Sequence, residues 1–139
     1  FYTNLNSPKS TDLKQNQKAA MCFHWKSIQR QIRISGTATQ VTDKEADLYF
    51  DSRSYESRIG AWASDQSSII KQRTDLSKKI EEYKKKYIEK KKIPRPKYWS
   101  GWCLNPLSIE FWLKGEFRIH ERLRYNKINK KWKKEILYP

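Results

Sequence analysis

The sequence predicts a fold that is mainly β with peripheral helices, most simply a small antiparallel barrel or sandwich. Short apolar segments with strand-like alternation recur along most of the chain. A single long stretch of helical periodicity interrupts them. Aromatic residues make up 14% of the 139 residues, whereas disordered chains are poor in aromatics. This length suits one domain with a modest core, covering residues 1–139.

Strands and capped helices alternate in the first part of the chain. Residues 1–3 have the character of a strand end, and Ser7–Pro8 forms the N-cap and first position of a short helix. Lys18–Trp25 is apolar and aromatic enough to predict a buried strand. The alternation over residues 31–36 predicts another strand that ends at its glycine, with residues 37–41 continuing it past a bulge.

Helices dominate the expected middle of the chain. Thr42 followed by acidic residues predicts a helix start. Residues 59–68 fit a short helix and turn. Apolar residues at 69, 76, 80, 83 and 87 form one stripe, so residues 69–92 predict a peripheral lysine-rich helix within the domain. The proline-punctuated residues 93–99 end it.

The last part of the chain reads as strands over residues 101–104, 108–113, 118–125 and 131–137. In the third of these, cations and a histidine occupy every second position and should line one face together; they are Arg118, His120, Arg122 and Arg124. Such a row needs water or an anion above it. A strand set of this kind also leaves an open edge, so pairing with further residues or a second subunit is expected.

The net charge of +15 comes mostly from two segments: residues 78–97 carry +7 and residues 126–139 carry +4. Charge runs are usually solvated faces, but a basic RNA- or polyanion-binding module stays open as an alternative. The longest apolar run, residues 19–23, is too short to cross a membrane. Cys22 and Cys103 are the only cysteines, which favours a reducing, cytoplasmic location.

Several kinds of site lack their sequence pattern. The cysteines and histidines do not have zinc-ligand spacing, and neither a nucleophile elbow nor a glycine-rich phosphate loop is present. What remains are cations beside aromatic and hydroxyl groups, notably Tyr49, Arg53 and Ser57 at intervals of four. Their spacing fits either surface arginine–carboxylate pairs or a small phosphate cradle, because a guanidinium matches phosphate oxygens.

Specific stretches carry a resemblance: "FYTNLNSPKS", "FHWKSIQRQIRISG", "YFDSRSYESRIGAWASDQSS", "IPRPKYWSGW", "IEFW" and "RIHERLRY". In this order and spacing, the chain resembles the pyridoxamine 5'-phosphate oxidase family of vitamin B6 metabolism. The resemblance implies an FMN-binding split β-barrel that forms a cytoplasmic homodimer, with FMN at the interface. It implies an oxidoreductase that converts pyridoxine or pyridoxamine 5'-phosphate to pyridoxal 5'-phosphate, with oxygen giving hydrogen peroxide. The family carries further sequence upstream of Phe1.

The resemblance also implies roles for residues. FMN contacts would be Tyr2, Thr3, Lys9, Gln31, Gln66, Ser67, Trp112 and Arg122. Tyr49, Arg53 and Ser57 would clamp the substrate phosphate. Arg118 and His120 would be the catalytic pair over the pyridine ring, with Ile119 between them in the substrate site.

The chain departs from the family pattern at several positions. Pro8 stands where an arginine is usual beside the phosphate-binding lysine, and Arg58 and Leu113 each replace a usual glutamine. Pro8 and the absent upstream strand of the family motivate a second alternative, a flavin- or pyridoxal-phosphate-binding relative that does not oxidise.

Overall fold

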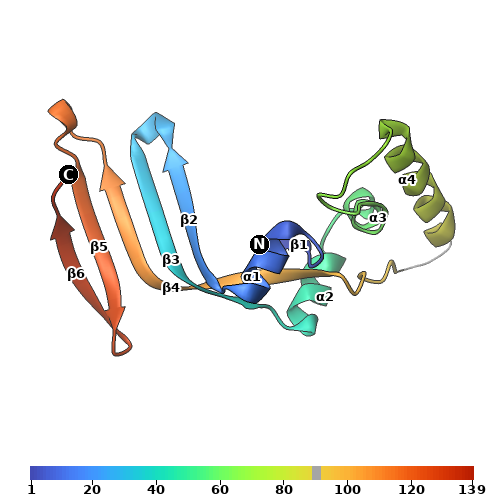
Figure 1. Cartoon of the computed structure of the whole chain (residues 1–139), viewed down its shortest axis with the longest axis horizontal. Coiled ribbons are helices and arrows are strands. Elements are labelled where there is room, and N and C mark those ends of the chain that lie inside the picture. The colour runs from blue at the N-terminus through green and yellow to red at the C-terminus, as the bar shows by residue number, and fades with distance from the viewer. Residues whose placement is uncertain (89–91) are drawn as a thin grey trace. The chain divides into compact units, whose positions relative to one another are not determined.

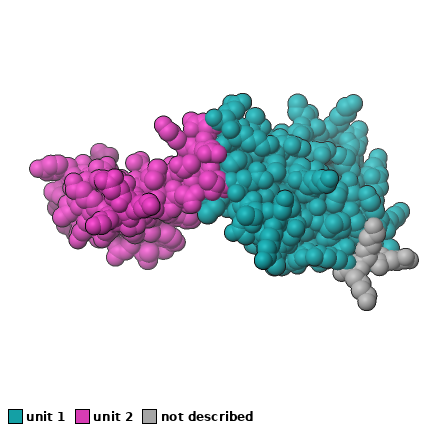
Figure 2. Space-filling view, turned by 90° about the horizontal axis from the view of Figure 1, so that it is seen from below, with its two compact units in different colours: residues 1–15, 40–103 teal, residues 16–39, 104–139 magenta. Residues whose placement is uncertain are grey.

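The computed structural model describes residues 1–88 and 92–139. These residues form two compact units, which Figure 2 colours separately. Unit 1 comprises residues 1–15 and 40–103, and unit 2 comprises residues 16–39 and 104–139. That the chain is a single domain stays a prediction.

Unit 1 contains the α-helices of the described residues (Figure 1). Its elements are β1 (Tyr2–Asn4), α1 (Pro8–Gln15), α2 (Asp43–Asp51), α3 (Tyr55–Ala63), α4 (Arg73–Tyr87) and the first residues of β4 (Trp99–Leu113). β1 pairs antiparallel with β4, with Tyr2 opposite Gly101. The buried cluster of this unit is made of Phe50, Ile59, Tyr87, Ile93 and Trp99. Helices α2, α3 and α4 and the connector before β4 therefore pack on one apolar centre.

Two helix starts are confirmed. α1 begins at Pro8, and the Ser7 carbonyl accepts hydrogen bonds from the backbone of Ser10 and Thr11. The predicted side-chain cap by Ser7 is wrong, because its hydroxyl is buried without a hydrogen-bond partner. α2 follows Thr42, which forms a capping box with Glu45: the Thr42 hydroxyl accepts from the Glu45 N–H at 3.2 Å, and the Glu45 carboxylate accepts from the Thr42 N–H at 2.9 Å.

The other two helices begin elsewhere than predicted. α3 starts at Tyr55 instead of residue 59, because the Ser54 hydroxyl accepts from the Ser57 N–H and caps it. α4 starts at Arg73, after a turn in which the Asp75 carboxylate accepts from the Gln72 N–H. Ile69 is fully exposed and outside the helix. Residues 89–91, which the prediction included, lie outside the described residues.

Unit 2 is an antiparallel sheet in the order β2-β3-β4-β5-β6. The strands are β2 (Lys18–Trp25), β3 (Arg30–Gln40), β4, β5 (Glu121–Ile128) and β6 (Lys131–Leu137). The bounds predicted for β2 and β6 are confirmed. β4 is one continuous strand where two were predicted. β3 likewise runs through Gly36 with unbroken pairing to β2, so the predicted stop and bulge are wrong.

Two further predictions for this unit are wrong. β2 is not buried: Phe23 and Trp25 are 44% and 43% exposed. The strand also lies at the end of the strand order, so only β3 pairs with it. Arg118 and His120 are not in a strand, since Glu116–Arg118 forms a 3-10 turn and β5 begins only at Glu121. Phe117 and Arg118 have φ angles of 52° and 66°, which reverse the chain and break the alternation. No helix in the described part of the chain is long and apolar enough to span a membrane.

Candidate functional site

Unit 1 holds a pocket of about 450 Å³ between β1, α2, α3 and the residues that follow α3. Six of the predicted site residues line it: Tyr2, Thr3, Tyr49, Arg53, Ser57 and Gln66. The remaining lining residues are Asn4, Gly60, Ala61, Ser64 and Trp99. The structure thus brings together the three residues predicted to clamp a phosphate.

Arg53 is the charged group of this pocket. Its guanidinium carbon lies 4.9 Å from the centroid of the Trp99 ring and 5.9 Å from that of Phe50. Its Nη1 atom is buried and has no hydrogen-bond partner. Burial lowers the pKa of the Arg53 guanidinium, an effect that the nearby Tyr49 hydroxyl opposes. Arginine remains protonated in proteins, so a half-buried positive charge with an unpaired Nη1 faces the pocket.

Polar groups surround this charge. Ser57 lies in the first turn of α3, where backbone N–H groups have no partner within the helix, and its hydroxyl accepts from Ser54 at 3.0 Å. The Gln66 side-chain oxygen accepts from the Thr3 hydroxyl at 3.1 Å and from the Asn4 N–H at 3.0 Å. These bonds tie the residues after α3 to β1 and fix one wall. This donor set suits a phosphate ester.

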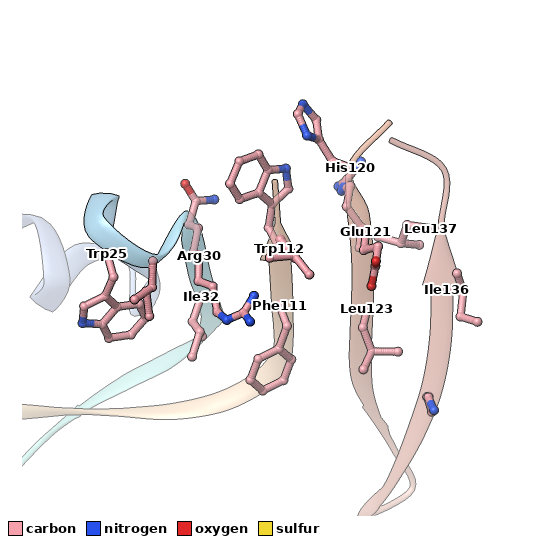
Figure 3. A pocket seen from close by; sticks show the side chains of 15 residues that line it. Trp25, Arg30, Ile32, Phe111, Trp112, His120, Glu121, Leu123, Ile136 and Leu137 are labelled. Atoms are coloured by element: carbon pink, nitrogen blue, oxygen red, sulfur yellow. The ribbon is translucent and has the colours of Figure 1, made fainter. Parts of the chain in front are cut away.

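Unit 2 holds a second pocket, of about 730 Å³, on its sheet (Figure 3). Most of its lining is apolar or aromatic, contributed by Trp25, Ile28, Ile32, Phe111, Leu113, Leu123, Ile136 and Leu137. Four predicted site residues are among the others, namely Gln31, Trp112, His120 and Arg122. A flat aromatic ligand with polar edges fits such a surface better than a small ion does.

His120 is held at the rim of this second pocket. Its ring lies 4.8 Å from the ring of Trp112, and its Nδ1 accepts from the Gly115 N–H at 3.3 Å. When Nδ1 accepts a hydrogen bond, the neutral ring carries its proton on Nε2. His120 therefore has an N–H available to donate to a ligand.

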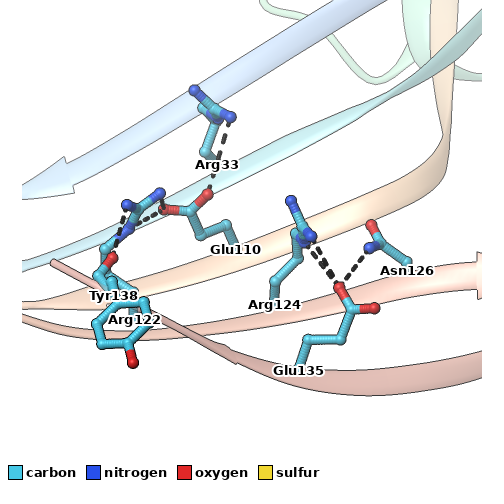
Figure 4. A network of polar contacts seen from close by, with 7 residues as sticks. All are labelled: Arg33, Glu110, Arg122, Arg124, Asn126, Glu135 and Tyr138. Atoms are coloured by element: carbon cyan, nitrogen blue, oxygen red, sulfur yellow. Dashed lines mark hydrogen bonds and ion pairs between the residues drawn. The ribbon is translucent and has the colours of Figure 1, made fainter.

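Arg122 is largely committed to protein partners (Figure 4). Its Nε donates to Glu110 at 2.9 Å, and Nη1 donates to the Tyr138 carbonyl at 3.0 Å. Arg33 approaches the other oxygen of Glu110 at 3.8 Å. Arg124 pairs in the same way with Glu135, at 2.8 Å. Of the two readings that the cation clusters left open, arginine–carboxylate pairing describes Arg122 and Arg124, while Arg53 has no carboxylate partner among the described residues.

Four predicted site residues lie in neither pocket. The Lys9 ammonium is 5.0 Å from the ring centroid of Phe1. Ser67 has a φ of 67° and lines a separate depression beside α4. Arg118 and the exposed Ile119 belong to the turn before β5. Among the residues described, no three histidine, cysteine, aspartate or glutamate side chains are placed to hold a metal ion.

Sequence reasoning missed two residues of these sites, Trp99 and Glu110. The Trp99 ring packs against the Arg53 guanidinium, and the Glu110 carboxylate accepts a hydrogen bond from Arg122. Both stand in stretches that carry the resemblance, "IPRPKYWSGW" and "IEFW". Their roles depend on which strands and helices lie opposite them, which spacing along the chain does not reveal.

Two family models match this chain over separate ranges of residues. Residues 1–87 match the family model described as pyridoxamine 5'-phosphate oxidase. Residues 99–139 match the model described as the pyridoxine 5'-phosphate oxidase C-terminal dimerisation region. The chain belongs to the pyridoxamine 5'-phosphate oxidase family. As a member of it, the protein is an oxidoreductase.

Relatives within the pyridoxamine 5'-phosphate oxidase family match the whole chain. The pyridoxine/pyridoxamine 5'-phosphate oxidase of Pelagibacter ubique is 61% identical, and the chain covers 67% of its length. The enzyme of the same name from Allorhizobium ampelinum is 47% identical, with 68% of its length covered.

Two solved structures share the fold of this family. PhzG from Burkholderia lata, solved in complex with tetrahydrophenazine-1-carboxylic acid, is 31% identical with a TM-score of 0.92, over all of this chain and 67% of that one. A pyridoxamine 5'-phosphate oxidase-related, FMN-binding protein from Nostoc punctiforme is 17% identical with a TM-score of 0.74, over all of this chain and 72% of that one. The predicted split β-barrel fold class is therefore confirmed.

Proposed function

We propose that this protein catalyses the FMN-dependent oxidation of pyridoxine 5'-phosphate or pyridoxamine 5'-phosphate to pyridoxal 5'-phosphate, with oxygen reduced to hydrogen peroxide. One observation carries the proposal: the Arg53 Nη1 is buried without a partner in a pocket that Tyr49 and Ser57 also line. A buried guanidinium nitrogen without a hydrogen-bond partner is costly unless an anion accepts its hydrogen bond. A phosphorylated vitamer supplies that anion.

The phosphate of the substrate would bind in the unit 1 pocket. Arg53 would donate a charge-assisted hydrogen bond, while Ser57 and Tyr49 add hydroxyl groups. Arg118 and His120 would act at the pyridine ring. The Nε2–H of His120 is suited to a ring oxygen, because Nδ1 is already occupied by Gly115. Holding the ring in a fixed pose is how such residues lower the barrier to transfer.

FMN, when bound, supplies the hydride acceptor and the route of electrons to oxygen. The residues proposed to hold it in unit 2 are Gln31, Trp112 and Arg122, which line a pocket with a broad apolar surface. In unit 1 the proposed contacts are Tyr2, Thr3, Lys9, Gln66 and Ser67. The donors among these residues and the aromatic surface fit a flavin phosphate and a flavin ring respectively.

We propose a homodimer with FMN at the subunit interface. The match of residues 99–139 to a dimerisation region supports it, as does the exposure of apolar side chains on unit 2, including Phe23, Trp25 and Ile136. A cytoplasmic location is proposed from the two free thiols, Cys22 and Cys103, both of which are exposed.

The test is a titration of the chain with FMN, followed by flavin-fluorescence quenching, with the mass of the complex measured in parallel. Saturable binding of one FMN per chain in a dimer is expected, followed by peroxide release with pyridoxine 5'-phosphate. The Arg53→Met variant should bind FMN normally but raise KM about 30-fold or more, the loss of a hydrogen bond to a charged group. A folded chain that binds no FMN, or that binds it and turns over no vitamer, overturns the proposal.

A further inference from the structure

We propose that Trp99 is a positioning residue for Arg53: its indole face holds the guanidinium in place for the substrate phosphate without neutralising it. This inference rests on the proposed function and deepens it, since it names what makes the site selective for phosphorylated vitamers.

The indole of Trp99 is itself firmly placed. Trp99 is 7% exposed and belongs to the buried cluster of unit 1. Phe50 meets it edge-on at 5.1 Å between ring centroids, and Tyr2 stacks on it at 5.3 Å. Tyr49 stacks in turn on Tyr2 at 3.9 Å. The ring therefore gives Arg53 a rigid surface, and the guanidinium lies within the range of a cation–π contact.

A second arginine of the same unit, Arg95, is neutralised by carboxylates instead of lying over an aromatic ring. Arg95 donates to the carboxylates of Asp47 and Asp43 at 2.6 and 2.7 Å and to the Trp99 carbonyl at 2.6 Å. Burial alone would lower the pKa of Arg95, but its two aspartates outweigh that effect and raise it. Arg95 is thus satisfied by the protein. Arg53 has an aromatic face where Arg95 has carboxylates.

This difference decides what each arginine can do. A carboxylate beside a guanidinium cancels its charge and occupies its donors, so little remains for a ligand anion. An aromatic face attracts the cation through its quadrupole and leaves every N–H free. Arg53 accordingly keeps its Nη1 unpartnered beside the pocket. Trp99 therefore pre-organises the Arg53 guanidinium, which gains its anionic partner only when a phosphate binds.

The consequence is a separation of kinetic effects. Weakening the Trp99 contact lets the guanidinium move and weakens binding of the phosphate ester, while the groups at the pyridine ring are untouched. KM for pyridoxine 5'-phosphate and the inhibition constant of inorganic phosphate should therefore rise together, with kcat unchanged.

The experiment combines Trp99→Phe, Trp99→Leu and Arg53→Met in the full chain loaded with FMN. Phenylalanine keeps a weaker aromatic face, so KM should rise about 3-fold, and leucine removes the face, so KM should rise about 10-fold or more. Neither change should have a further effect in the Arg53→Met background, because the two residues act as one unit. Trp62→Phe is the matched control: Trp62 packs against the same buried cluster but does not line this pocket, and its contacts are with Lys86 and the Pro94 carbonyl, so KM should not change.

Thermal unfolding checks that the variants fold, and if the leucine variant does not, Trp99→Phe alone decides the matter through its coupling with Arg53→Met. Equal effects of the Trp99 changes with and without Arg53, or an unchanged phosphate inhibition constant in folded Trp99→Phe, overturn the inference. If Arg53→Met itself leaves KM unchanged, the phosphate clamp of the proposed function is what fails.

Discussion

A single carboxylate oxygen of Glu110 accepts a hydrogen bond from the Nε of Arg122 at 2.9 Å and forms an ion pair with its Nη2 at 2.8 Å. The two residues lie on adjacent antiparallel strands, where Trp112 is opposite Arg122 and Arg124 is opposite Glu110. The pair is thus diagonal across β4 and β5. Because the Glu110 side chain is only 12% exposed, this ion pair is fixed more firmly than a surface pair.

Replacing Glu110 by alanine should lower the free energy of unfolding by about 1–3 kcal/mol, because Arg122 loses its charged partner in a half-buried setting. Urea denaturation measures this loss. The control is Arg33→Ala, which removes an exposed arginine 3.8 Å from the same carboxylate and should cost less than about 1 kcal/mol. Equal losses in the free energy of unfolding for the two variants would mean that the ion pair of Glu110 with Arg122 adds no stability.

Arg118→Ala should reduce kcat for pyridoxine 5'-phosphate about 100-fold or more while FMN stays bound, if Arg118 acts on the substrate ring. Fluorescence titration of FMN and steady-state turnover measure the two effects separately. Arg30→Ala is a suitable comparison, because Arg30 lines the unit 2 pocket but has no proposed role. Loss of FMN from the Arg118→Ala variant would show that the role proposed for Arg118 is wrong.

The capping box of α2 should make stability depend on pH. The Thr42 hydroxyl and N–H both donate to the Glu45 carboxylate and lower the pKa of Glu45 from its usual 4.5. A carboxyl with a lowered pKa in the folded state stabilises the protein above its unfolded pKa, and this contribution is lost as pH falls through the lowered value. The stability difference between the native chain and Glu45→Gln should therefore be constant above pH about 5 and disappear at lower pH. A difference that does not vary with pH in thermal unfolding would contradict this.

How far the sequence predicts this structure depends on the range of the interactions involved. The helix start after Thr42 was predictable because a capping box acts over three residues. The start at Pro8 was predictable from the fixed φ of proline, although the Ser7 hydroxyl makes no capping bond. The bounds of β2 were predictable from composition, but its exposure was not, since burial depends on which strands flank it. In the same way, the resemblance grouped Tyr49, Arg53 and Ser57, but these residues lie in α2, in the connection after it and in α3. Their convergence, and the contact of Trp99 with Arg53, therefore required the tertiary fold.

Two glycines should respond in opposite ways to alanine. A Cβ on Gly36 would lie 2.0 Å from the Asn105 carbonyl oxygen, so Gly36→Ala forces backbone apart and should cost about 2–3 kcal/mol. A Cβ on Gly60 would meet nothing within 4 Å, and Gly60 lies inside α3. Gly60→Ala should therefore raise stability by about 0.5–1 kcal/mol through helix propensity. Urea unfolding of both variants without ligand tests the pair, and a stabilised Gly36→Ala would show that the strands are not so closely packed.

Replacing Phe117 by glycine should relieve backbone strain in the turn before β5. Phe117 has a φ of 52° and is 90% exposed, so its ring stabilises little while its backbone is strained. Glycine adopts positive φ without that penalty, though it loses more entropy on folding. The balance predicts that Phe117→Gly raises the free energy of unfolding by about 0.5–1 kcal/mol in urea. Phe117→Ala removes the same ring and keeps the strain, so it should leave stability unchanged; an equal gain in both variants would attribute the effect to the exposed ring instead of the backbone.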